Sequence, residues 1–195
     1  MRLRPALALL AALLPIGGCA TRFVDTWKSP EWSGPPLRSV LVVGNAPTEL
    51  GRRAYEDAMG ARLAEIGVRA EPSYRLLPER IDREEIARAV VARNHDGLIA
   101  ARLVGVDQRA TYVPGGPAYG PYAGWRAWGG FTEPGYVKVD QIARIETQVW
   151  ALAGRGTMIW AGASETVNPR EISNLAGSLA DTTVSTLQKS GILPK

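Results

Sequence analysis

The first half of the chain alternates between short apolar runs and longer stretches in which apolar residues recur every three or four positions. Residues 39–44 form a continuous apolar run, which is typical of a strand buried on both faces. Residues 49–66 have a helical period and end at Gly67, which fits a left-handed helix terminus. The apolar stripe of this helix consists of Tyr55, Met59, Leu63 and Ile66.

A second helix is marked by a capping box, in which Asp82 begins the helix and Glu85 occupies its third position. The helix is expected to run to about residue 93, between strands at residues 68–74 and 97–106. Strand, helix, strand, helix, strand predicts parallel pairing through right-handed crossovers.

Residues 137–152 and 157–167 alternate with a period of two and are joined by glycines, which predicts a β-hairpin. A three-residue turn would place one set of side chains on the packed face, namely Ala143, Ile145, Val149, Ala151, Ile159, Ala161 and Ala163. The opposite set would meet solvent or a partner, and it comprises Arg144, Glu146, Gln148, Trp150, Trp160, Ser164 and Thr166. We therefore expect Trp150 and Trp160 to form part of a binding face.

The last helix is expected to begin after Asn168 as N-cap, with Pro169 in its first position, and to end before Gly191. The fold class is therefore α/β, with residues 37–195 forming a single domain. Its mixed sheet, in two or three layers, would have about five strands in the order βαβαβ, followed by a hairpin and a C-terminal helix.

Residues 1–18 have the layout of a secretory signal, with Arg2 and Arg4 before an apolar run that is too short to span a membrane. The stretch from Ile16 to Cys19 resembles the lipobox of bacterial lipoproteins, in which the cysteine sulfur carries a lipid. The alternative is an ordinary signal with a stray thiol at Cys19. Since Ala20 and not aspartate follows the cysteine, the resemblance implies lipid anchoring in the outer membrane, facing the periplasm.

Residues 19–36 would then be the lipidated cysteine and a linker that contains Trp27 and Trp32. These tryptophans argue against a free tether. Either the segment around residues 24–27 pairs with the edge of the domain, or the tryptophans lie at the membrane interface.

Composition adds little to this picture. Removing residues 1–18 leaves 21 basic and 19 acidic side chains, a net charge of +2 without any basic block, so we expect no nucleic-acid partner. With its single cysteine lipidated, the domain would have no disulfide.

Residues 107–136 are predicted to be an inserted loop rich in glycine and aromatic residues. Seven of the fourteen aromatic residues lie between positions 112 and 136. The segment is either a mobile surface loop or a recognition loop for a glycan, a membrane interface or a protein. The expected contact residues are Tyr112, Tyr119, Tyr122, Trp125 and Trp128.

Residues for familiar catalytic chemistry are scarce. His95 is the only histidine, and we expect it at the surface near a helix end. We expect no metal site, no cofactor and no enzyme activity. Glu146 and Glu165 would point to opposite faces of the hairpin, which argues against a carboxylate pair. The turn at residues 44–48 precedes a helix but matches no phosphate-binding motif.

Three segments resemble an uncharacterised family of bacterial envelope lipoproteins, classed as a domain of unknown function. They are residues 27–30 (Trp-Lys-Ser-Pro), 72–78 (Pro-Ser-Tyr-Arg-Leu-Leu-Pro) and 160–169 (Trp-Ala-Gly-Ala-Ser-Glu-Thr-Val-Asn-Pro). The element order is also similar to that of small periplasmic domains in activators of cell-wall synthases and in the curli-export lipoprotein.

The resemblance implies a non-catalytic binding or adaptor module anchored in the outer membrane through Cys19, with an envelope protein or cell-wall glycan as partner. The alternatives are a small-ligand or cell-wall glycan binding protein, and a subunit or regulator of an envelope assembly or cell-wall enzyme.

Overall fold

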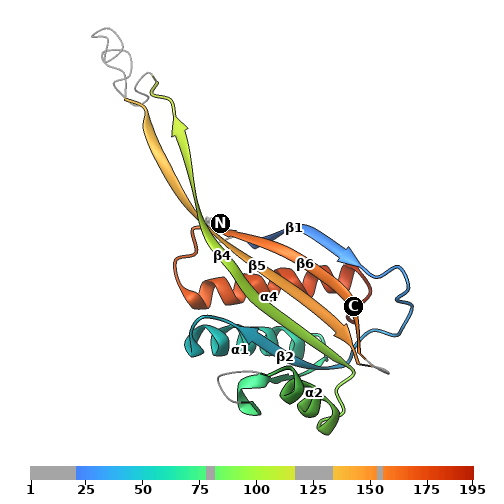
Figure 1. Ribbon diagram of the computed structural model, residues 1–195. Helices are drawn as coiled ribbons and strands as arrows, with labels where there is room; N and C mark the ends of the chain where they lie inside the picture. Colours follow the sequence, from blue (N-terminus) through green and yellow to red (C-terminus); the bar gives the residue numbers. More distant parts are fainter. Residues whose placement is uncertain (1–20, 78–81, 117–133, 153–155) are drawn as a thin grey trace, which may run out of the picture.

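The computed structural model describes residues 21–77, 82–116, 134–152 and 156–195. They form one mixed six-stranded sheet in the order β1-β6-β5-β4-β2-β3 (Figure 1). The strands are β1 Thr21–Lys28, β2 Ser39–Asn45, β3 Arg69–Pro72, β4 Gly97–Val113, β5 Tyr136–Ala151 and β6 Thr157–Val167. The helices are α1 Glu49–Glu65, α2 Arg83–Ala92 and α4 Ile172–Lys189, with a short 3-10 turn η1 at Ser73–Arg75.

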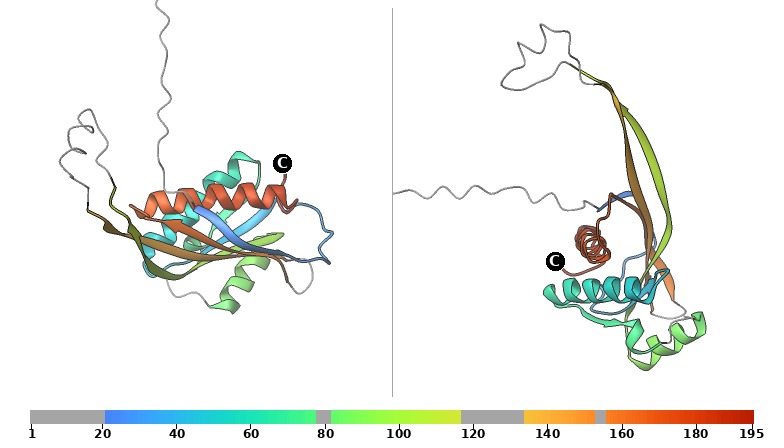
Figure 2. Two further views of the ribbon diagram at one scale, coloured as in Figure 1. Left: turned by 90° about the horizontal axis from the view of Figure 1, so that it is seen from above. Right: turned by 90° about the vertical axis from the view of Figure 1, so that its left-hand side faces the viewer.

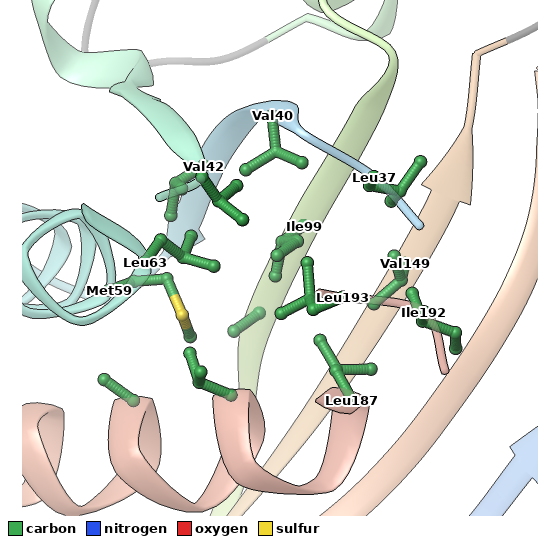
Figure 3. Close-up of a cluster of buried hydrophobic side chains, with 14 of the residues drawn as sticks. Leu37, Val40, Val42, Met59, Leu63, Ile99, Val149, Leu187, Ile192 and Leu193 are labelled. Atoms are coloured by element: carbon green, nitrogen blue, oxygen red, sulfur yellow. The ribbon is translucent and has the colours of Figure 1, made fainter. Parts of the chain in front are cut away.

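The described helices cover the sheet unequally. Helices α1 and α4 lie together on one face, here called the inner face, and α2 lies on the opposite, outer face (Figure 2). The main core lies on the inner face, where Met59 and Leu63 of α1 meet Leu187 of α4 over Ile99 and Val149 (Figure 3). The predicted α/β fold class is confirmed, and so is the buried stripe of α1.

The sheet has six strands and not about five, because residues 21–28 form the edge strand β1. This strand pairs antiparallel with β6, as the edge-pairing interpretation of residues 24–27 expected. The description of residues 19–36 as a linker is therefore wrong from Thr21 to Lys28. Trp32, farther along, packs against the core, whereas Trp27 is exposed on β1.

The predicted register of the hairpin is wrong. Val149 pairs with Trp160 and Trp150 pairs with Met158, which leaves Ile159 as an extra residue in β6. This β-bulge directs both Ile159 and Trp160 into the core, where each is only 1% exposed. Trp160 is therefore not part of a binding face, and Ser164 and Thr166 are buried as well.

Two helix starts differ in their agreement with the sequence. The capping box of Asp82 and Glu85 is confirmed at α2. Asn168 does not cap α4, whose N-cap position is Glu171. Asn168 instead adopts a left-handed conformation with φ of 49°, and its side chain accepts from the backbone N–H of Gln141.

Strands β4 and β5 continue together beyond the sheet as a two-stranded arm, formed by residues 106–113 and 136–143 (Figure 1). The predicted loop at 107–136 is therefore wrong at both ends, because residues 107–113 and 136 are paired strand. The long stretch of period-two sequence in β5 continues on its partner β4, whose outer half was assigned to the loop. Tyr119, Tyr122, Trp125 and Trp128 lie outside the described residues, as does Cys19.

Candidate binding site on the outer face of the sheet

The outer face of β1, β6, β5 and β4 presents side chains in rows that run across the strands. One row joins Trp27, Ala161 and Gln148, and the next joins Asp25, Ala163, Glu146 and Arg102. Helix α2 packs over β2 and the beginning of β4, and no described helix covers β5, β6 and β1 on this face (Figure 2). An open sheet face is thus left between two tryptophans, Trp27 and Trp150.

Polar side chains along β5 are joined by hydrogen bonds. The Trp150 Nε1–H donates to Gln148 Oε1 at 3.3 Å, and Gln148 Nε2 donates to Glu146 Oε1 at 2.7 Å. Arg102 donates from Nε and Nη2 to Glu146 Oε2 at 2.9 and 2.6 Å. The amide of Gln148 and the guanidinium of Arg102 lower the pKa of Glu146. Glu146 is therefore an ionised acceptor at neutral pH and is unsuited to donate a proton.

A second charged group lies farther along the same face. Arg144 contacts Glu165 at 3.3 Å and Asp107 at 2.9 Å, and Arg22 of β1 lies 3.7 Å from Glu165. Glu165 pairs with Arg144 across the strands and so shares the face of Glu146. The prediction that the two glutamates point to opposite faces is wrong, since it assumed a hairpin without the bulge.

A hollow of about 540 Å³ opens where this face meets the turn at residues 44–48. Its walls include Arg102, Glu146 and Gln148 from the sheet, Arg52 from α1 and Ile86 from α2. It lies at the carboxyl end of β2, the usual position of ligand sites in parallel α/β sheets. The lining combines charged, amide and apolar groups, which suits a polar ligand or a projecting side chain of a partner.

A buried carboxylate holds this turn in place. Glu56 is fully buried and accepts from the Gly44 N–H at 2.8 Å, the Ser73 hydroxyl at 2.6 Å and the Tyr74 N–H at 2.8 Å. Arg52 pairs with it at 3.2 Å. Sequence analysis missed this network. Its signal was available, because Arg52 and Glu56 are four residues apart and adjoin the apolar stripe of α1.

A smaller hollow of about 260 Å³ lies on the inner side of the same turn, between the first turns of α1 and α4. Its walls are mainly apolar, with Leu103, Ile145 and Leu175 among them. Tyr55 also lines it, and the Tyr55 hydroxyl is buried without a hydrogen-bond partner among the described residues. Burial raises the pKa of Tyr55, so the phenol remains neutral.

His95 is buried and not at the surface, which corrects the prediction. Its Nδ1 lies 3.0 Å from Ser39 Oγ, and its Nε2 lies 3.2 Å from Glu71 Oε2. Because Arg69 donates two hydrogen bonds to Ser39 Oγ, the serine hydroxyl donates to Nδ1, and Nε2–H donates to Glu71. The histidine joins β2, β3 and the start of β4, and is far in the sheet from the hollow at the other end of β2.

The structure brings Trp150 to the open outer face and removes Trp160 from it. Tyr112 is 65% exposed on the arm, where it pairs with Val137 and lies over Gly135. Within the described ranges, no three potential ligands are grouped as a metal site would require. No helix in the described part of the chain is long and apolar enough to cross a membrane.

Comparison with known proteins finds similar folds only at low identity. PelC from Paraburkholderia phytofirmans, solved as a dodecamer, is 13% identical, with a TM-score of 0.44 over 87% of this chain and 96% of that one. Lipoprotein GNA1162 from Neisseria meningitidis is 14% identical, with a TM-score of 0.42 over 77% of this chain and 98% of that one. No protein-family model and no curated protein matches the chain. At this level the similarities do not assign the chain to a family.

Proposed function

We propose that the protein is a non-catalytic adaptor of the bacterial envelope, held in the outer membrane by lipidated Cys19 and facing the periplasm. The observation that carries the proposal is the open outer face of β5 and β6, with its hydrogen-bonded row from Trp150 to Arg102. The partner bound there would be another envelope protein.

The chemistry of this face suits protein recognition. Tryptophan and arginine are the residues that most often dominate binding energy at interfaces. Here Arg102 and Trp150 are already held by hydrogen bonds, so less side-chain freedom is lost when a partner binds. The small side chains of Ala161 and Ala163 lie between the rows of β1 and β5, which lets a partner approach the sheet closely.

A photo-activated cross-linking amino acid at position 163 tests the proposal in intact cells, because Ala163 is exposed at the centre of the face. The matched control places the same amino acid at the exposed Glu84 of α2. We expect one discrete cross-linked product from position 163, none from position 84, and loss of the product when Ala161→Arg is added. A product that survives Ala161→Arg, or equal products from both positions, would contradict the proposal.

The hollow beside the same face favours a second candidate function, binding of a small polar ligand or a cell-wall glycan. Gln148, Glu146 and Arg102 offer donors and acceptors to hydroxyl groups, and Trp150 lies beside Gln148. Titration of soluble cell-wall fragments against tryptophan fluorescence tests this function. The Trp150→Phe variant should lose the response, and Trp32→Phe, a change on the packed side of the domain, should keep it. A response that persists in Trp150→Phe would place binding elsewhere.

A further inference from the structure

The described chain begins on the inner face, beside the base of the arm. The backbone N–H of Thr21 donates to Ser178 of α4 at 3.0 Å, and the Thr21 and Thr166 hydroxyls are 2.7 Å apart. Thr166 pairs in turn with Ala143, and Ala143 pairs with Val106. These four strand residues form one row across the sheet, and the arm extends from it. Cys19 precedes Thr21 by only two residues, so the lipid-bearing Cα is at most about 7 Å from the Cα of Thr21.

The arm has one apolar side and one charged side. The side that continues the inner face carries the apolar arm surface, which consists of Val106, Ala110, Tyr112, Val137 and Val139. Val106, Tyr112, Val137 and Val139 are 53–65% exposed. The other positions on this side are Gln108 and Gln141, so the described part of this side carries no charge. The opposite side carries Asp107, Arg109, Thr111, Lys138 and Asp140.

Exposed apolar side chains gather at this end of the molecule. Of the twelve large hydrophobic side chains exposed within the described residues, six lie between positions 104 and 139. Leu50, Val167 and Ile172 add to them in the first turn of α1, at the end of β6 and in the first turn of α4. An apolar surface of this kind in an exported protein indicates a contact with a partner or a membrane.

We propose that the apolar arm surface rests on the lipid leaflet that holds the acyl chains of Cys19. The inference rests on the membrane anchoring in the proposed function. The anchor begins beside the arm and on the same side of the sheet, so the arm and the lipid are confined to one another at high local concentration. Uncharged apolar residues with an interfacial tyrosine suit the boundary between headgroups and acyl chains. The outer face is on the opposite side of the sheet and would be turned towards the periplasm, available to a protein partner.

Probes on neighbouring residues of β5 test this orientation, because Val139 and Lys138 point to opposite sides of the arm. The full-length lipidated protein, carrying Val139→Cys or Lys138→Cys, is labelled with an environment-sensitive dye. It is then inserted into vesicles of phosphatidylethanolamine and phosphatidylglycerol that contain a spin-labelled lipid. We expect a blue-shifted emission and strong quenching by the spin label at position 139. At position 138 we expect weak quenching and free access of iodide.

Other results would overturn the inference, and they separate it from the proposed function. Equal lipid quenching at both positions would mean that the arm does not lie on the leaflet by its apolar surface, and the adaptor function would remain. Val139→Cys copies that cross-link to each other, with little lipid quenching, would identify a second copy of the chain as the occupant. Failure of the parent protein to float with the vesicles would contradict the anchoring itself, and with it both proposals.

Discussion

The hydroxyl oxygens of Thr21 and Thr166 lie 2.7 Å apart and are buried, which ties the beginning of β1 to the end of β6. Thr21 is also held by α4, because Ser178 accepts from its backbone N–H and Thr182 donates to its carbonyl at 3.2 Å. The folded domain therefore begins two residues after Cys19, without a spacer. A lipid at Cys19 would restrict the whole domain to the membrane surface and would limit its orientation there.

Replacing Cys19 by serine should release the protein from the membrane or leave it unprocessed, because the serine side chain cannot carry the thioether-linked lipid. Cell fractionation followed by detection of the protein and its apparent mass is the measurement. The conservative change Thr21→Ser is the control and should leave the protein in the outer membrane. A Cys19→Ser protein that is processed and remains stably in the outer membrane would contradict the lipid anchor.

Replacing Glu56 by alanine should destabilise the domain by about 3–5 kcal/mol, since Arg52 would be left buried without this carboxylate. The backbone N–H groups of Gly44 and Tyr74 would lose their acceptor as well. The matched control is Glu65→Ala in the same helix. Its side chain is 60% exposed in a surface pair with Arg62, and the expected loss is below about 1 kcal/mol. Urea denaturation measures both, and equal losses would show that the buried network contributes little.

Two glycine-to-alanine changes should have opposite signs. A Cβ at Gly162 would collide with the Trp160 ring and would come within 2.8 Å of Phe23, so Gly162→Ala should cost about 1–3 kcal/mol. A Cβ at Gly177 of α4 would meet nothing within 4 Å. Gly177→Ala should therefore stabilise the domain by about 0.5–1 kcal/mol, through helix propensity. Thermal unfolding of the two variants checks the pair, and a neutral Gly162→Ala would mean that Trp160 repacks freely.

The pKa of His95 should lie below its ordinary value of about 6.5, because burial disfavours the charged ring more than Glu71 favours it. The unfolded chain then binds more protons than the folded chain between the lowered pKa and about 6.5. Stability should be complete above that pH and should fall as the pH drops through this range. NMR titration of the single histidine measures the pKa directly. A folded-state pKa above that of the urea-unfolded chain would contradict the neutral, buried ring.

The His95→Gln variant provides the thermodynamic counterpart of this titration. Glutamine has no proton to gain in this range, so its free energy of unfolding should change less between pH 7 and about 5 than that of the parent protein. The difference between the two pH profiles isolates the histidine from the carboxylates, which titrate at lower pH.

The sequence by itself determined the elements that depend on neighbouring residues. The stripe of Tyr55, Met59 and Leu63 located α1, because side chains three and four positions apart share one side of a helix. The capping box of Asp82 and Glu85 located the start of α2, since both hydrogen bonds close within one turn. The alternation of β5 and β6 predicted a hairpin with nearly the observed bounds.

Only the tertiary structure decided how these elements meet. Alternation defines the two faces within one strand, but a bulge at Ile159 changed which face of β6 joins the core, and it buried Trp160. His95 became buried because Ser39 and Glu71, distant in sequence, supply its partners. β1 became an edge strand through pairing with a segment more than a hundred residues away. Such long-range pairings leave no periodic signal in either segment. The open outer face and the apolar arm surface, on which both proposals rest, exist only once these pairings have formed.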